Sequence, residues 1–269
     1  MSCSRRSWLA GAASGAAALA LPRLCEAAAP RSRDTAVGSP VRTSPVRAVA
    51  FDSYGTLFDV ESLAVLGEEL YPGQGKALSM LWRRKQIEYT WLRTLLHRYR
   101  DFAAVTEDGL VFAAAKLKLE LTADKRKRLL EQYVRLDAFA DVVDGIDAFR
   151  RLKLPLAIVS NGTPEMLRRE VRYIGIESQF DRLVSVDTVH AYKTDPRIYL
   201  AGARALGMQP RNICFVSSHS WDVIGAVSTG YAGFWVDRAG EPIEELGVPI
   251  AHRGTTLLDA ARFVEGAMA

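Results

Sequence analysis

The chain has 269 residues, of which 49% are hydrophobic and 25% charged, and its formal net charge is +4. This length and balance are typical of a globular protein of one or two domains with a sizeable core, and nothing indicates disorder beyond residue 45. Part of the small positive charge lies in the first 29 residues, so the remainder is too weakly basic to indicate a nucleic-acid partner.

The first 29 residues differ in composition from the rest of the chain. Arg5 and Arg6 precede a mildly apolar stretch rich in Ala and Gly, and small residues from Ala27 onward offer a cleavage site. This pattern predicts a twin-arginine signal peptide over residues 1–29 and therefore a periplasmic protein. The alternative is an extension that is not a functional signal, with a cytoplasmic location. The apolar part is too short to span a bilayer, so no stable membrane anchor is expected.

Residues 30–45 are predicted to form a linker, because they are rich in Arg, Ser, Thr and Pro. Two of the three cysteines, Cys3 and Cys25, lie in the predicted signal. Cys214 would then be alone in the mature chain, so no intrachain disulfide is expected there. It falls in an apolar run, where we expect it to pack rather than react.

The apolar run over residues 46–51 predicts a buried strand of a parallel sheet, and Asp52 follows it directly. Ligands of open α/β sheets bind at the carboxyl ends of the strands, so this carboxylate is expected in the functional crevice. Gly55 permits a sharp turn, and the Thr56 hydroxyl can bond to an anion or a neighbouring carboxylate. Taken alone, Asp52 could equally cap a turn or a helix.

Residues 61–138 are predicted to form an all-helical cap inserted after this first motif. Apolar side chains recur at helical spacing over residues 78–96, while most of the basic ones lie off that stripe. Further helices are expected over residues 106–119 and 122–136. Each begins with a Thr, Thr106 or Thr122, that is suited to N-capping.

From Gly145 onward, strands and helices alternate again. Strands are expected at residues 156–160, 183–186, 213–217 and 234–236, and helices begin near Pro164, Pro196 and Trp221. Residues 46–60 and 139–269 therefore predict an α/β core built on a doubly wound parallel sheet with right-handed crossovers. The site is expected between this core and the helical cap.

Three further polar motifs accompany these later elements. Ser160 and Asn161 end a predicted strand, Lys193 precedes a predicted helix, and the loop after residue 217 leads through His219 to Asp222. Each motif alone is a weak signal. Together with Asp52 and in this order, the four motifs are strong evidence for one site.

The four motifs resemble those of the haloacid dehalogenase superfamily, and the resemblance extends from residue 46 to about residue 240. Phosphatases and phosphomutases of the superfamily usually carry a second Asp two residues after the nucleophile, because an alkoxide leaving group needs a general acid. Tyr54 stands at that position here, which resembles the L-2-haloacid dehalogenase branch. Segment 81–93 is similar to the cap helix of that branch, and the resemblance makes Arg83 the halide acceptor.

The resemblance implies a haloacid dehalogenase-like, Rossmannoid fold and a covalent mechanism without a cofactor or metal. Asp52 would attack the halogen-bearing carbon of a short L-2-haloalkanoate to form an ester, and water would then release the (R)-2-hydroxy acid. Lys193 would keep Asp52 ionised. Asp222 would hold Lys193 and position water, and Ser217 would bond to that pair. The predicted catalytic set is Asp52, Thr56, Lys193, Ser217, His219 and Asp222.

For substrate binding, the resemblance assigns the substrate carboxylate to Ser160 and the departing halide to Asn161. A local capping role for these two residues is the alternative. The expected substrate-binding set also contains two cap arginines and a largely aromatic wall, namely Arg83, Arg84, Tyr54, Ile87, Phe102, Tyr199 and Trp221.

Two residues depart from the family pattern. Arg84 stands where Gln is common, and it could strengthen anion binding or widen the range of acids accepted. His219 stands where Asn is common, and it could help to activate water next to Asp222. Either side chain could instead face solvent. The halide preference is therefore left open, and fluoroacetate-type substrates are included.

Two rival functions follow from the same residues. A phosphatase of this superfamily would need magnesium held by Asp52 and Asp222, and Tyr54 argues against it. The second rival is an exported binding protein without turnover. It does not account for the intact Asp52, Lys193 and Asp222. The expected partner is a small haloacid, and the resemblance also leads us to expect a homodimer formed through the helical parts.

Overall fold

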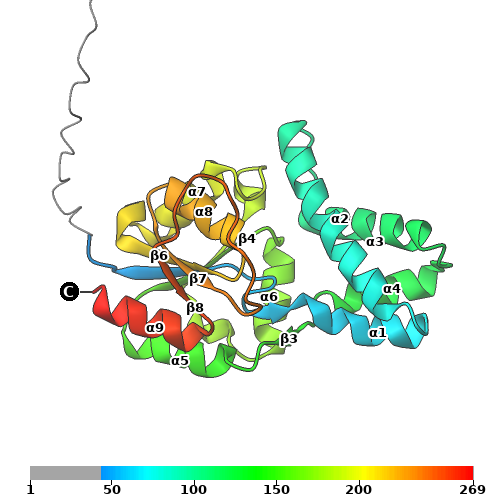
Figure 1. Ribbon diagram of the computed structural model, residues 1–269, viewed down its shortest axis with the longest axis horizontal. Helices are drawn as coiled ribbons and strands as arrows, with labels where there is room; N and C mark the ends of the chain where they lie inside the picture. The colour runs from blue at the N-terminus through cyan, green and yellow to red at the C-terminus, as the bar shows by residue number, and fades with distance from the viewer. Residues whose placement is uncertain (1–43, 269) are drawn as a thin grey trace, which may run out of the picture. The chain divides into compact units, whose positions relative to one another are not determined.

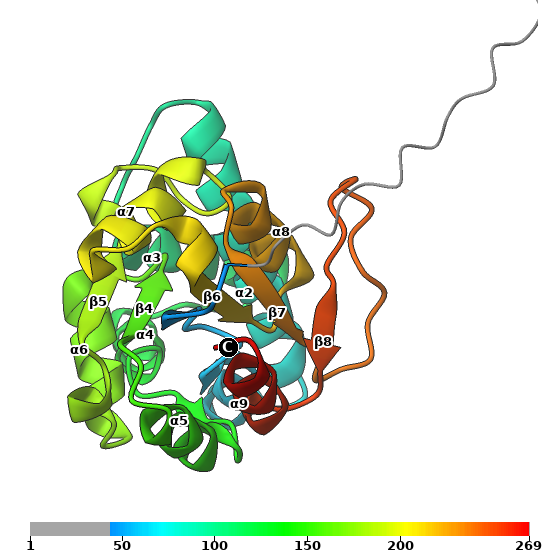
Figure 2. The same cartoon turned by 90° about the vertical axis from the view of Figure 1, so that its left-hand side faces the viewer.

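The computed structural model describes residues 44–268, so the predicted signal peptide and nearly all of the predicted linker lie outside the described residues. Six parallel strands form one sheet, in the order β5-β4-β1-β6-β7-β8 (Figures 1 and 2). The predicted α/β class with a parallel sheet is confirmed. The strands are β1 (Ala48–Phe51), β4 (Leu156–Ser160), β5 (Arg182–Ser185), β6 (Ile213–Ser217), β7 (Ala232–Val236) and β8 (His252–Gly254).

Strand β1 lies in the middle of the sheet, with β4 on one side and β6 on the other. Its last residue, Phe51, is in register with Ile158 and with Val216. All residues of β1, β4 and β6 are buried, as their continuous apolar runs predict for a sheet covered on both faces. The three strands therefore end together, and the polar residues that follow them meet at one edge.

Helices cover both faces of this sheet (Figures 1 and 2). Helices α7 (Pro196–Leu206) and α8 (Ser220–Ser228) lie on one face, and α5 (Val142–Arg151) and α9 (Leu257–Gly266) lie together on the other. Helix α6 (Pro164–Tyr173) connects β4 to β5. As predicted, α6 and α7 begin at Pro164 and Pro196, because Thr163 and Asp195 immediately before them accept hydrogen bonds from the first turns.

Four further helices lie between β1 and α5 in the chain and form a separate helical layer (Figure 1). They are α1 (Leu63–Leu70), α2 (Gly75–Leu95), α3 (Phe102–Lys116) and α4 (Ala123–Gln132). The chain enters and leaves this layer through two short antiparallel strands, β2 (Phe58–Asp59) and β3 (Asp137–Ala138). The sequence analysis did not predict β2, β3, β8 or α9. No helix among the described residues is both long enough and apolar enough to cross a membrane.

The predicted start of α3 at Thr106 is wrong. The helix begins one turn earlier, because Asp101 accepts a hydrogen bond from the Ala104 backbone N–H at 2.8 Å and is therefore the N-cap. Thr106 is buried inside the helix, where its hydroxyl donates to the Phe102 carbonyl at 2.6 Å. Thr122 does cap α4, by accepting from the Lys125 backbone N–H.

Candidate active site

Asp52 lies directly after β1, at the edge where the central strands end, and only 6% of its surface is exposed. Its backbone N–H donates to the Val216 carbonyl of β6 at 2.9 Å, which continues the sheet pairing by one residue. The two carboxylate oxygens have different partners. Oδ1 accepts from Lys193 Nζ at 2.8 Å, and Oδ2 accepts from the Thr56 hydroxyl at 2.9 Å.

Lys193 bridges two carboxylates in the interior of the protein. Its Nζ lies 2.8 Å from Asp52 Oδ1 and 2.8 Å from Asp222 Oδ2, and its surface is only 1% exposed. The backbone N–H of Lys193 donates to Asn161 Oδ1 at 3.1 Å, which fixes the loop that carries it. The structure thus brings together the three residues that the sequence singled out most strongly, from three different segments of the chain.

Asp222 lies in the first turn of α8 and is fully buried. Its second oxygen, Oδ1, accepts a hydrogen bond from the Tyr199 hydroxyl at 2.7 Å. Tyr199 was predicted to line the substrate pocket. Its side chain is fully buried, because α7 packs against α8, and contact with substrate remains a prediction. The Tyr199 hydroxyl therefore orients Asp222.

The charges of this group depend on one another. Burial raises the pKa of Asp52, but the charge of Lys193 and the contacts with Lys193 and His219 outweigh burial and hold the pKa well below its ordinary value. Burial lowers the pKa of Lys193, but the two carboxylates together raise it above its ordinary value. For Asp222, burial raises the pKa more than Lys193 and Tyr199 lower it. Asp52 is therefore the carboxylate that stays ionised most firmly.

Thr56 connects Asp52 to the loop after β6. Its hydroxyl donates to Asp52 Oδ2 and accepts from the Ser218 backbone N–H at 2.9 Å. Ser217 was predicted to bond to Lys193 and Asp222, but its hydroxyl instead accepts from the His219 backbone N–H at 3.1 Å. Ser217 therefore shapes the start of α8 because its side chain turns along its own loop.

His219 contacts the candidate nucleophile directly. Its Nδ1 lies 3.3 Å from Asp52 Oδ2, and about a quarter of its side chain is exposed. The ring reaches this position over Gly55, where a Cβ would lie 2.5 Å from His219 Cε1. Gly55 also has a φ of +88°, so both the turn and the close approach require glycine. The sequence analysis placed His219 beside Asp222, whose backbone N–H donates to the His219 carbonyl at 3.1 Å, but it did not predict the contact of the His219 ring with Asp52.

Ser160 and Asn161 follow β4 and are both buried. The Ser160 hydroxyl accepts from the Gly162 backbone N–H at 3.1 Å, which is the local bonding that the alternative prediction described. Asn161 uses its carbonyl oxygen for Lys193, so its amide group is directed away from that contact. Binding of a carboxylate or a halide by these two residues remains a prediction.

Arg83 reaches the nucleophile loop from helix α2. Its guanidinium donates to the Tyr54 carbonyl at 3.2 Å and to Gln86 Oε1 at 2.8 Å. Gln86 is fully buried and also accepts from the Tyr133 hydroxyl at 2.8 Å. The sequence analysis missed Gln86 and Tyr133. The spacing of three residues between Arg83 and Gln86 was the available signal, because it places both on one helix face.

Arg84 and Ile87 do not join the site. Arg84 is exposed, and it lines neither of the two cavities beside Asp52 and Lys193. Ile87 is half-buried and also lines neither cavity. The exposure of Arg84 agrees with the alternative in which it faces solvent, and contact of either residue with substrate remains a prediction. Helix geometry explains the exposure of Arg84, since Arg83 turns toward the nucleophile loop and its immediate neighbour must point elsewhere.

The predicted aromatic wall is present in part. Tyr54 and Phe102 are buried, with ring centroids 5.2 Å apart, and Tyr133 joins them 5.5 Å from Tyr54. Trp221 lies at the start of α8, and its ring meets Trp91 of α2 edge to face at 5.6 Å. Aromatic contacts therefore connect the helical layer to the sheet edge on two sides.

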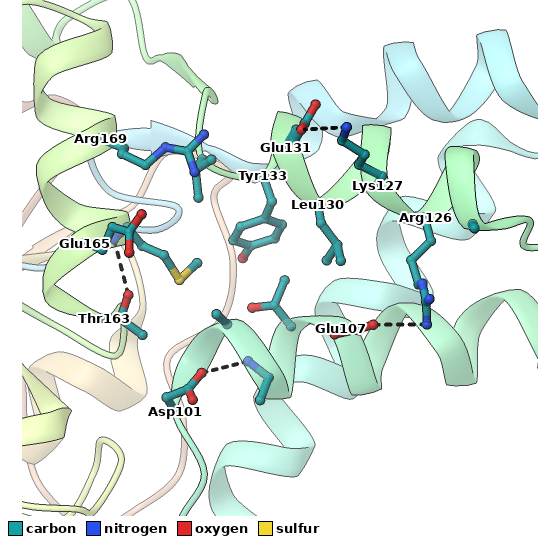
Figure 3. Close-up of a pocket in the computed structure, with 16 residues that line it drawn as sticks. Asp101, Glu107, Arg126, Lys127, Leu130, Glu131, Tyr133, Thr163, Glu165 and Arg169 are labelled. Atoms are coloured by element: carbon teal, nitrogen blue, oxygen red, sulfur yellow. Dashed lines mark hydrogen bonds and ion pairs between the residues drawn. The ribbon is translucent and has the colours of Figure 1, made fainter.

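Two cavities adjoin the Asp52 and Lys193 pair, and Trp221 lines both. One has a volume of about 290 Å³ and is lined by Arg83, His219 and Gly55 among others. The other has a volume of about 480 Å³ and reaches Lys193. A third cavity of about 640 Å³ lies between α3, α4 and α6, where Tyr133 forms part of its wall (Figure 3). Asp52 lines none of these three cavities. We place the site in the first two, because His219 lines one and Lys193 lines the other, and both side chains contact Asp52.

The donor set does not match the magnesium site of the rival prediction. Asp52 and Asp222 share the ammonium group of Lys193, so a cation of the protein itself already compensates their charge. Tyr54 supplies no carboxylate at the position where phosphatases carry one. Among residues 44–268, no group of three or more His, Cys, Asp or Glu side chains lies close enough together to hold a metal ion.

Comparison with known proteins identifies the family. A family model described as haloacid dehalogenase-like hydrolase matches residues 46–230. The chain is 45% identical to an (S)-2-haloacid dehalogenase of Pseudomonas sp. strain YL, over 75% of this chain and 87% of that protein. It is 43% identical to haloacetate dehalogenase H-2 of Moraxella sp. strain B, over 75% of this chain and 90% of that protein.

Solved structures agree with these sequence matches. A crystal structure of an L-2-haloacid dehalogenase matches with a TM-score of 0.80 and 43% identity, covering 82% of this chain and all of that chain. The L-2-haloacid dehalogenase of Xanthobacter autotrophicus with chloropropionic acid covalently bound matches with a TM-score of 0.79 and 33% identity, covering 83% and 100%. This chain therefore belongs to the family of haloacid dehalogenase-like hydrolases.

Removal of the buried cation tests the charge balance of the site. We expect Lys193→Gln to lower the free energy of unfolding by about 3–5 kcal/mol near neutral pH, because two buried carboxylates lose their shared partner. The depressed pKa of Asp52 stabilises wild type above the ordinary value of 3.8, and this contribution is lost as pH falls through the folded-state pKa. The difference between wild type and variant should therefore shrink on acidification.

Denaturant unfolding at neutral pH and at about pH 3, below the ordinary carboxyl pKa, measures this effect. Lys85→Gln is the matched control, because Lys85 pairs with Glu88 at the surface. It should cost no more than about 1 kcal/mol at either pH. Equal effects of the two substitutions would contradict the buried ion triplet.

Proposed function

We propose that the protein is an (S)-2-haloacid dehalogenase, which hydrolyses short L-2-haloalkanoates to (R)-2-hydroxy acids and halide. The observation that carries this proposal is the buried Asp52 carboxylate, held ionised by Lys193 at the end of the central strand, without a second acid two residues later. The names of the relatives, (S)-2-haloacid dehalogenase and haloacetate dehalogenase, support the same reaction.

In the first step, an Asp52 oxygen attacks the halogen-bearing carbon from the side opposite the halogen. A carbon–oxygen bond forms, the carbon–halogen bond breaks, and the halide leaves with the bonding electrons, which inverts the carbon. A halide needs no proton, so Tyr54 can replace the acid of a phosphatase. The leaving anion needs positive charge, and Arg83 in the cavity beside His219 supplies it.

In the second step, water attacks the carbonyl carbon of the Asp52 ester, and the bond between this carbon and the substrate oxygen breaks. One proton of the water ends on the substrate oxygen, which gives the hydroxy acid, the other passes to solvent, and the Asp52 carboxylate is restored. Lys193 Nζ and the Thr56 hydroxyl each contact an oxygen of Asp52, so they are positioned to stabilise the negative charge that develops there. His219 lies 3.3 Å from Asp52 Oδ2, and we assign to it the activation of this water. Asp222 positions Lys193 throughout.

The substrate class extends to unbranched haloacetates in our proposal. The name of the Moraxella relative supports this extension, because it gives haloacetate as the substrate. The position of Arg83 in a small cavity of about 290 Å³ suits a short acid. Fluoroacetate-type substrates belong to the same class and are included.

Halide release from L-2-chloropropionate, measured with and without EDTA, separates this proposal from its rivals. Chelator-resistant release supports the dehalogenase. Phosphate release that depends on magnesium would support the phosphatase, and binding without either release would support the non-catalytic protein. The contact of Lys193 with both Asp52 and Asp222 favours the first outcome.

A single turnover in heavy-oxygen water, with enzyme in excess, tests the covalent route. The first product should be mostly unlabelled, because its new oxygen comes from Asp52. The label should enter the peptide that contains Asp52, as mass spectrometry can show. The peptide that contains Asp222 is the internal control and should stay unlabelled. Label in the product and none in the Asp52 peptide would contradict the ester intermediate.

Arg83 and Arg84 form a matched pair of substitutions. Arg83→Ala should lower the rate of ester formation on the order of a hundredfold or more, because a donor to the leaving halide is lost. Arg84→Ala should change this rate by less than about twofold, as expected for an exposed side chain. Rapid-quench measurement of halide in the first turnover gives both rates. The opposite order of effects would assign the halide to Arg84.

We also propose that the protein is exported to the periplasm by a twin-arginine signal over residues 1–29, which lies outside the described residues. Arg5, Arg6 and the apolar stretch after them support this proposal. Changing both arginines to Lys should leave the precursor uncleaved in the cytoplasm, as fractionation and immunoblotting can show. Uncleaved wild-type protein in the cytoplasm of its native host would contradict export.

A homodimer formed through the helical layer is a further part of the proposal. The end of α2 supports it, because Leu92, Leu95 and Leu96 expose between 43% and 76% of their surface there. Exposed apolar side chains in one place are typical of protein–protein contacts. Sedimentation of the purified protein tests this part independently of activity.

A further inference from the structure

Glu170 is a buried acid that the proposed mechanism does not use. It lies on α6, and only 1% of its surface is exposed. Neither of its carboxyl oxygens has a hydrogen-bond partner among the described residues. Buried polar groups are nearly always paired, and an unpaired buried charge is costly, so this carboxyl requires a physical explanation.

Two hydroxyls of the nucleophile loop lie beside this carboxyl. They belong to Ser53 and Tyr54, which follow Asp52 directly in the chain. Both side chains are buried, and both hydroxyl oxygens also lack a hydrogen-bond partner among residues 44–268. The carboxyl and the two hydroxyls therefore form one buried polar cluster, which we call the Glu170 cluster, with unused hydrogen-bonding capacity.

Within residues 44–268, no cation balances the charge that Glu170 would carry, in contrast to Asp52. Burial raises the pKa of Glu170 well above its ordinary value, and only the hydroxyls of Tyr54 and Ser53 oppose this shift. Tyr133 and Arg83 also lie near Tyr54. The positive charge of Arg83 opposes the rise in pKa that burial causes in the two tyrosines. A protonated acid offers one O–H donor and one carbonyl acceptor, which match the two hydroxyls of the cluster.

We propose that Glu170 is a positioning residue, which stays a neutral acid and serves as the hydrogen-bonding partner of the otherwise unpaired Tyr54 hydroxyl, so that the Tyr54 ring and backbone keep their places beside the substrate pocket. Gly162 leaves room for this hydroxyl, since a Cβ there would lie 3.0 Å from it. The Tyr54 carbonyl accepts from Arg83 at 3.2 Å. Glu170 thus acts on the halide site through Tyr54 and does not touch the substrate.

Infrared difference spectroscopy tests the protonation state without any assay of activity. The carbonyl stretch of a protonated carboxylic acid should be present in wild type at neutral pH and lost in Glu170→Gln. Glu165→Gln is the control, because Glu165 is exposed on the same helix, and it should not remove that band. If the band is the same in wild type and in Glu170→Gln, Glu170 is ionised and the proposal is wrong.

Kinetics tests the positioning role, which rests on the proposed dehalogenation. Glu170→Gln should keep the rate of ester formation from L-2-chloropropionate within about threefold, because the amide is neutral and offers both a donor and an acceptor. Glu170→Met should lower this rate about tenfold and leave ester hydrolysis unchanged, because Tyr54 and Arg83 serve the first step. A merely structural role would affect both steps.

A double-mutant cycle with Tyr54→Phe decides whether the effect passes through the Tyr54 hydroxyl. In that background Glu170→Met should cost less than about twofold, because the hydroxyl it positions is absent. Additive losses, or a Gln variant as impaired as the Met variant, would overturn the positioning role. If wild type releases no halide at all, the dehalogenase proposal fails, while the infrared band still decides the state of Glu170.

Discussion

The contact of Lys193 with Asp52 and Asp222 is the interaction on which the rest of the active site depends. Three charged groups are buried together, and any one of them alone would be strongly destabilising there. The ammonium group lies 2.8 Å from an oxygen of each carboxylate. Their meeting requires the fold, because β1 must lie beside β6, and the loop that carries Lys193 must be held by Asn161 at the end of β4. The central strands therefore determine the chemistry through this contact.

The charge balance of that triplet explains why a helical layer is needed. One cation between two carboxylates leaves the group negative when both are ionised, and a haloacid brings a further negative charge. A second cation must therefore come from outside the sheet edge, and Arg83 of α2 reaches the Tyr54 carbonyl from there. Gln86 accepts from Arg83 and Tyr133, so a buried amide fixes this arginine toward the sheet. An arginine fixed in this way binds an anion at lower entropic cost than a free surface side chain.

The sequence predicted the residues whose positions follow from the ends of the strands. It did not predict contacts that depend on the direction in which a side chain points. Asp52, Lys193 and Asp222 meet because parallel strands end at one edge. The helix starts at Pro164 and Pro196 were also predictable, since proline and a capping residue act locally.

Other assignments needed information that a linear pattern does not contain. Tyr199 turns toward Asp222, and Ser217 turns along its own loop, although both follow motifs that were recognised. Arg84 differs from Arg83 only by one residue of helix rotation, which is enough to place it in solvent.

Glu170 gave no signal in the sequence, because an acid in an amphipathic helix is ordinarily expected on the exposed face. Two buried acids of one region differ in how they are stabilised. Asp52 keeps its charge because Lys193 reaches it, whereas no cation of the described residues reaches Glu170, so a neutral acid is the stable form there. Contact with Lys193 therefore separates Asp52, which keeps the charge that a nucleophile needs, from Glu170.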